Sequence, residues 1–164
     1  MLIEQSTQDL AASRVVGANV TLRDVRLAYC RTQSERSFVL HGRNSEPQIT
    51  RATRTHLRHE ENLILPIELT LSVQDVESED VVIRIDCTFE ADYTVKAGFE
   101  PTTEQIRSFH EANVVFNCWP FFRELVHSLC MRMGHPPIAV PLLRMGLKPN
   151  PPSDGVPTAP STSP

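Results

Sequence analysis

Residues 81–95, VVIRIDCTFEADYTV, alternate strictly between apolar and polar side chains. A period of two places successive side chains on opposite faces of a β-strand, so this segment predicts one long strand with one buried and one wet face. Residues 65–73 alternate in the same way, and the short acidic stretch QDVESED separates the two runs. The sequence therefore predicts an antiparallel hairpin with an apolar face that needs a cover.

Further strands are predicted before this hairpin. NVTLRDVRLAYC, residues 19–30, reads as a strand whose apolar phase changes between Leu22 and Val25, as one extra residue in a β-bulge would cause. A shorter strand is predicted at 37–41. Residues 43–62 are polar, rich in arginine and without a period, so we interpret them as an irregular crossover segment rather than as a nucleic-acid site.

Two helices are predicted after the long strand. The start PTTEQ predicts a capped helix over about 103–112. A second helix is predicted over about 119–133, with Asn117 as its cap, Pro120 in its first turn and Gly134 as its stop. Its apolar side chains recur at three- and four-residue spacings, which assigns them to the core or to a subunit interface. They are Phe122, Leu125, Val126, Leu129 and Met133, with Cys130 on the same stripe.

Strands followed by helices indicate an α+β fold, an antiparallel four-stranded sheet with C-terminal helices packed on one face. A chain of 164 residues is long enough for one ordinary domain. We assign that domain to residues 15–148. It follows an N-terminal segment, 1–14, that is partly disordered or helical, and it precedes a proline-rich tail, 149–164, whose composition predicts disorder.

Composition excludes several classes of function. The net charge of −4 argues against a general nucleic-acid binder, and no apolar run approaches the ~18 residues needed for membrane insertion. The N-terminus lacks the basic and apolar regions of a secretory signal, so we expect a cytoplasmic protein. The motifs of phosphate-binding loops, dinucleotide sites and hydrolase nucleophiles are absent, so we expect no enzyme, no catalytic residue and no cofactor.

An alternative reading makes the chain a small zinc-binding or ligand-binding α+β protein. Its zinc ligands would be Cys118, His127, Cys130 and His135. The spacing lacks the two close ligand pairs typical of zinc sites, so we favour packing and predict no metal. A cysteine nucleophile is disfavoured because the apolar stripe would raise the pKa of its thiol.

The C-terminal block CWPFFRELVHSLCMRMGHPPI resembles the main-helix region of SecB, the protein-export chaperone family. The resemblance begins with a proline that is followed, after two bulky residues, by Arg123-Glu124. An apolar helix with Ser128 and Arg132 comes next, and an extended segment with Pro136 and Ile138 follows that helix. The strand end YTVKAGFE is also similar to the close of the family's last strand.

This resemblance implies a homotetramer, a dimer of dimers, that holds unfolded client polypeptides in apolar grooves without ATP. Clients would be preproteins for export or one dedicated client such as an antitoxin of a toxin–antitoxin pair. Export members dock the SecA motor through an acidic tail segment, and they carry a further C-terminal helix. Here the tail contains one aspartate, Asp154, and PLLRMGLKP runs straight into it, so the dedicated subtype is favoured.

Candidate client-binding residues are large apolar side chains that stand among polar neighbours outside the main alternation. They are Phe38, Leu40, Ile49 and Leu57. Each side chain could instead anchor its loop to the core. Client binding and anchoring are equally favoured for Phe38 and Leu40, and anchoring is favoured for Ile49 and Leu57.

Overall fold

A computed structural model describes residues 1–35 and 46–148. The predicted strand at 37–41, with Phe38 and Leu40, lies outside the described residues. In chain order the elements are β1 (Leu2–Gln5), α1 (Thr7–Gly17), β2 (Val20–Ser34), β3 (Gln48–Thr53), β4 (Leu57–His59), β5 (Asn62–Gln74), β6 (Val81–Val95), α2 (Thr103–Phe109), the π-helical η1 (His110–Val114), α3 (Val115–Arg132) and β7 (Arg144–Leu147).

The α+β fold with an antiparallel main sheet and C-terminal helices is confirmed, but the sheet has five strands rather than four. Its order is β2-β6-β5-β3, and β4 pairs with the same edge of β5 as β3 does, at the start of β5. The interpretation of 43–62 as irregular was therefore wrong. Most side chains of β3 and β4 are exposed, so these strands carry no apolar period and are held by backbone pairing.

The predicted hairpin is confirmed. β5 and β6 pair antiparallel over their length, and their apolar residues meet on the inner face, where Leu69 lies opposite Cys87. The bulge in the first long strand is confirmed too, because the pairing of β2 with β6 shifts register between Leu22 and Asp24. A second shift follows between Leu27 and Tyr29.

The start of the first helix is confirmed by a capping box between Thr102 and Gln105, but its end is not where predicted. The π-helical η1 joins α2 directly to α3, so Asn117 is no cap and Pro120 lies inside a helix. Residues 112–118 bury Ala112, Val114, Val115 and Cys118, and this packing outweighs the local stop and start signals. Gly134 ends α3 as predicted, at a φ of +82° that favours glycine.

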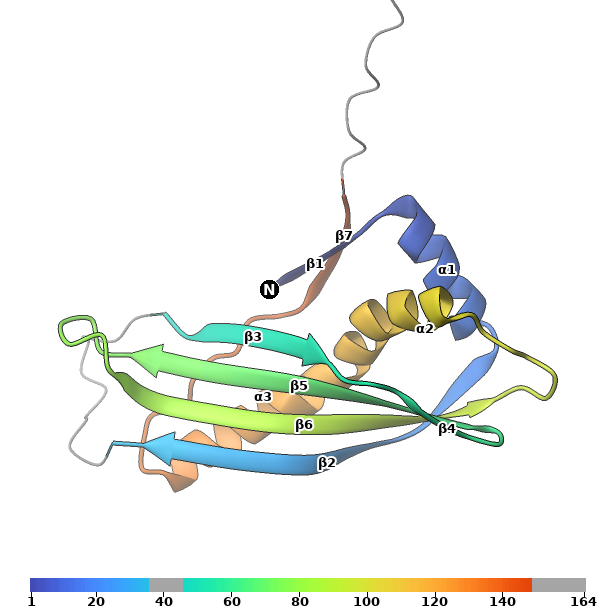
Figure 1. The fold of residues 1–164 in the computed structure, drawn as a ribbon. Coiled ribbons are helices and arrows are strands. Elements are labelled where there is room, and N and C mark those ends of the chain that lie inside the picture. The colour runs from blue at the N-terminus through green and yellow to red at the C-terminus, as the bar shows by residue number, and fades with distance from the viewer. Residues whose placement is uncertain (36–45, 149–164) are drawn as a thin grey trace, which may run out of the picture.

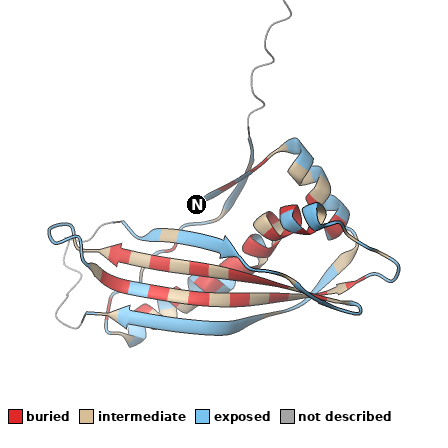
Figure 2. Ribbon diagram, in the orientation of Figure 1, coloured by how far each residue is buried: buried red, intermediate tan, exposed pale blue. Residues whose placement is uncertain are grey.

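The helices lie on one side of the sheet, where α3 runs behind the central strands (Figure 1). Burial is concentrated in β5, β6 and the helices, whereas β2 and β3 are mostly exposed (Figure 2). In α3 Phe122 and Val126 are fully buried, while Leu125, Leu129 and Met133 are partly buried and pack against the same core. One helix layer thus covers the central strands β5 and β6, whereas most of the outer strands β2 and β3 is exposed.

A second, two-stranded sheet was not predicted. β1 pairs in parallel with β7, which brings the two ends of the described chain together. The segment after α3 is tied to that helix, because Trp119 Nε1 donates to the carbonyl of Pro141 at 2.9 Å and Arg123 Nε donates to that of Val140 at 3.0 Å. These bonds guide the chain back to β1.

His110 generates a prediction about pH. Its ring is buried in η1, with Nε2 2.8 Å from the carbonyl oxygen of Pro66, and burial lowers its pKa below the ordinary 6.5. Below pH 6.5 the imidazole of His110 is therefore protonated more readily in the unfolded chain than in the folded chain. As the pH is lowered below 6.5, the free energy of unfolding should decrease, by up to about 1.4 kcal/mol per pH unit from His110.

The measurement is urea unfolding at several pH values. His110→Gln should flatten the decline below pH 6.5, whereas the control His59→Gln, at an exposed position, should leave it unchanged. Equal slopes for wild type and His110→Gln would contradict the assignment.

Candidate functional site

The inner face of β2 is covered only in part: Val20 and Val25 pack against the core, whereas other apolar residues of this face are exposed. Its register with β6 places Leu22 opposite Tyr93 and Leu27 opposite Phe89. Both aromatic residues are buried under the helices, whereas Leu22 is 41% exposed and Leu27 is 44% exposed. Cys30, opposite Cys87, is also exposed. We refer to Leu22, Leu27 and Cys30 as the β2 face.

β2 is also an edge strand. It pairs with β6 along one side only, so the other edge of this 15-residue strand has no partner strand within the described chain. A long edge beside uncovered leucines is a template for pairing with another chain. The β2 face and this edge therefore form one candidate assembly surface.

Apolar side chains also gather around the pair β1 and β7, which we call the ribbon. One hollow of about 490 Å³ is lined by Met1, Leu2, Pro141, Leu142 and Arg144. A smaller hollow of about 190 Å³ is lined by Gln5, Leu10, Met145, Gly146 and Leu147. Leu142 is 65% exposed and Leu147 is 59% exposed. The ribbon is thus a second uncovered apolar region, separate from the β2 face.

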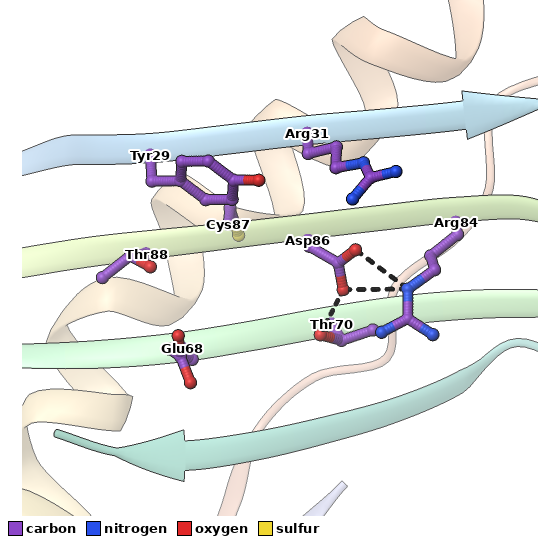
Figure 3. A pocket seen from close by; sticks show the side chains of 8 residues that line it. All are labelled: Tyr29, Arg31, Glu68, Thr70, Arg84, Asp86, Cys87 and Thr88. Atoms are coloured by element: carbon purple, nitrogen blue, oxygen red, sulfur yellow. Dashed lines mark hydrogen bonds and ion pairs between the residues drawn. The ribbon is translucent and has the colours of Figure 1, made fainter.

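The outer face of the main sheet carries a polar hollow instead, shown in Figure 3. Within it the Asp86 carboxylate accepts from Arg84 Nε at 2.8 Å and from the Thr70 hydroxyl at 2.8 Å. These contacts, led by Arg84, lower the pKa of Asp86. Asp86, Arg84 and Thr70 thus satisfy one another, and the paired, ionised carboxylate is a poor proton acceptor.

The predicted client-binding residues that the structure describes differ in burial. Ile49 lies in β3 opposite Leu71 and packs, half-buried, against the core. Leu57 lies in β4 opposite Ile64 and is 58% exposed. Ile49 thus has an anchoring contact, while most of the Leu57 side chain is open to solvent.

The four candidate zinc ligands do not form a metal site. Cys118 and Cys130 are fully buried in α3, while His127 is exposed on the same helix. His135 has a different partner, since its Nε2 lies 2.5 Å from the Ser34 hydroxyl. Across residues 1–35 and 46–148, no three histidine, cysteine, aspartate or glutamate side chains are placed to hold a metal ion.

The buried thiols are poor nucleophiles. Burial raises the pKa of Cys87 and of Cys118 to about 12, and it raises that of Cys130 as well. A thiol in such an environment stays protonated and unreactive near neutral pH. These cysteines therefore act as small apolar side chains in the core.

The main sheet with its layer of helices has a SecB-like fold. The chain is similar to the SecB-like chaperone Rv1957 of Mycobacterium tuberculosis, solved in complex with a ChAD peptide from the Rv1956 HigA1 antitoxin. The TM-score is 0.73 at 19% identity, and the match covers 83% of this chain and 99% of that chain. The predicted resemblance in fold is thereby confirmed.

A weaker likeness connects the chain with a protein of unknown function from Streptococcus agalactiae, at a TM-score of 0.37 and 10% identity, covering 75% of this chain and 97% of that one. No protein-family model and no curated protein matches the sequence. Among the helices of the described residues, none is long and apolar enough to cross a membrane.

Thiol labelling tests the placement of the cysteines. In a Cys30→Ser variant the remaining thiols are the buried Cys87, Cys118 and Cys130. We expect them to react with a thiol reagent at least about a hundredfold more slowly in the native protein than in urea, because labelling requires local opening. Rapid native labelling of Cys118 or Cys130 would show that α3 is not seated on the sheet as described.

Proposed function

We propose that the protein is a holding chaperone that binds unfolded or partly folded client polypeptides on its uncovered apolar surfaces. The observation that carries the proposal is the exposure of large apolar side chains on the β2 face and the ribbon, within a SecB-like fold. A contiguous exposed apolar region signals interaction with another polypeptide. The similar chaperone from Mycobacterium tuberculosis was solved with a peptide bound.

The β2 face supports assembly of the chain with itself. A second copy that covers Leu22 and Leu27 would remove apolar area from water at about 25 cal/mol per Å². It would also protect the free edge of β2, which is a hazard for non-specific aggregation when left open. A two-fold pairing through this face gives a dimer, and a second, different two-fold interface would join two such dimers into the homotetramer that we propose.

Holding requires no chemistry beyond burial of apolar surface. We propose that it proceeds without ATP, in the cytoplasm, and that many weak contacts along an extended client supply the affinity. A dedicated client such as an antitoxin is favoured over general export. Docking of SecA is disfavoured, because the sequence of residues 149–164 offers one acidic side chain, Asp154.

Of the predicted client-binding residues, Leu57 fits the role best, since it is the more exposed of the two described ones. The contact of Ile49 with the core favours anchoring. We retain Phe38 and Leu40, which lie outside the described residues, as candidates from the sequence.

Solution mass tests the assembly. Light scattering on the wild type should give four times the chain mass of 18.5 kDa. Leu27→Asp should give a smaller species, because a buried unpaired carboxylate on the β2 face opposes assembly. Val76→Asp is the matched control, since Val76 is 63% exposed in the connection between β5 and β6. A wild type that stays a single chain at all concentrations would contradict the proposed assembly.

An aggregation assay without nucleotide tests holding. The purified protein should suppress aggregation of a denatured model substrate, or of an antitoxin encoded beside its gene if the client is dedicated. Leu57→Ala should weaken suppression with little change in stability. Ile49→Ala should instead lower the free energy of unfolding by about 1–2 kcal/mol, below the range for fully buried residues. Failure with both substrates at several-fold excess would remove the chaperone proposal.

A further inference from the structure

β7 presents unpaired main-chain groups on one edge. The amides of Arg144 and Lys148 donate to the carbonyls of Met1 and Gln5 at 3.0 and 2.8 Å, so both point towards β1. Main-chain groups of successive residues in a strand point to alternate edges. The amides and carbonyls of Met145 and Leu147 therefore point to the opposite edge, where no strand of the described chain pairs with β7.

The two hollows of the ribbon lie on opposite faces of this edge. Leu2 pairs with Arg144 on one face, where the larger hollow forms. Met145 and Leu147 belong to the other face and line the smaller hollow together with Leu10 of α1. A strand added beside β7 would send successive side chains to alternate faces, so it could fill both hollows.

Charge indicates what such a strand would carry. The segment 136–148 contains Arg144 and Lys148 and no acidic residue, in a chain of net charge −4, and the paired strand β1 contributes one carboxylate, Glu4, opposite Gly146. The side chain of Arg144 is exposed, and within the described residues it makes no ion pair or side-chain hydrogen bond. An acidic side chain on the added strand would be attracted to this end of the larger hollow.

A second copy of β7 is a poor occupant of the same edge. Antiparallel pairing of two β7 strands about Gly146 would place Arg144 of one copy opposite Lys148 of the other. Like charges directly opposite each other destabilise a strand pair. The edge is thus better suited to an acidic, apolar peptide than to self-association.

We propose that the free edge of β7 binds an extended client segment as an added β-strand, with apolar side chains in both hollows and an acidic side chain at Arg144. The identity of the occupant as client rests on the proposed holding function. Binding of a peptide to the ribbon does not depend on the holding function, because that binding can be measured with a short peptide alone.

The experiment uses fluorescence anisotropy of a labelled peptide, Asp-Leu-Val-Leu-Val-Ser, with the full chain. Wild type should bind it about two- to fivefold more tightly than the same peptide with lysine in place of aspartate. Arg144→Glu should reverse that preference. A peptide methylated at alternate backbone nitrogens should bind at least about tenfold more weakly, because the added strand loses its hydrogen bonds.

Two substitutions test the hollows separately. Leu142→Ser removes apolar lining from the larger hollow and Leu147→Ser from the smaller one, and each should weaken peptide binding about tenfold. Both side chains are exposed, so thermal unfolding should change little. Val76→Ser, at the distant β5–β6 connection, is the matched control and should bind like wild type.

The outcomes separate this proposal from the holding function. Unchanged binding in Leu142→Ser, Leu147→Ser and the methylated peptide would overturn the added strand, and so would an absence of binding to wild type. If aggregation is still suppressed in these cases, the chaperone proposal stands and the client site lies elsewhere. Specific peptide binding without suppression of aggregation would instead support the ribbon site and overturn the holding function.

Discussion

The packing of one helix layer on one face of the β5–β6 hairpin determines the rest of the structure. These two strands present an almost continuous apolar surface, on which large side chains such as Leu63, Leu69, Phe89 and Val95 are buried. The layer covers the flanking strands only in part, because Val25 of β2 and Ile49 of β3 pack against the core while most of these two strands is exposed (Figure 2). The same packing that stabilises the protomer therefore leaves β2 and the ribbon open.

These two open regions differ in kind, which suits them to different partners. The β2 face adjoins a long free edge in the main sheet, where a second copy could extend an existing layer. The ribbon is short, lies apart from the main sheet, and combines two apolar hollows with Arg144 and Lys148. Assembly through the first region would leave the second available to an extended polypeptide, which is the arrangement that a holding chaperone requires.

Much of the fold follows from local patterns in the sequence, and the failures have identifiable causes. Strict alternation predicts β5 and β6, the phase change at Leu22 predicts the bulge in β2, and Gly134 predicts the end of α3. The edge strands β3 and β4 are missed by such reasoning because nearly all of their side chains, Ile49 excepted, are exposed. The continuity of α2, η1 and α3 escapes it because burial of Val114 and Val115 outweighs the signals of Asn117 and Pro120.

The candidate site was harder to predict from the sequence than the fold. Ile49 and Leu57 look alike as single apolar residues among polar ones, and only the pairing of their strands shows that one packs on the core. The ribbon depends on contact between residues about 140 positions apart, and no local period encodes that contact. An acid-free segment with exposed leucines, as at 136–148, is the one signal that could have directed attention to it.

Hydrogen exchange of the assembled protein, with and without a denatured substrate, tests the central claim most directly. The account predicts that the amides on the free edge of β2 are protected in the assembly before substrate is added, and that the free-edge amides of Met145 and Leu147 in β7 gain protection only when substrate binds. Fast exchange of the free-edge amides of β2 at every protein concentration, with no region protected by substrate, would contradict the claim that these open apolar surfaces bind other chains.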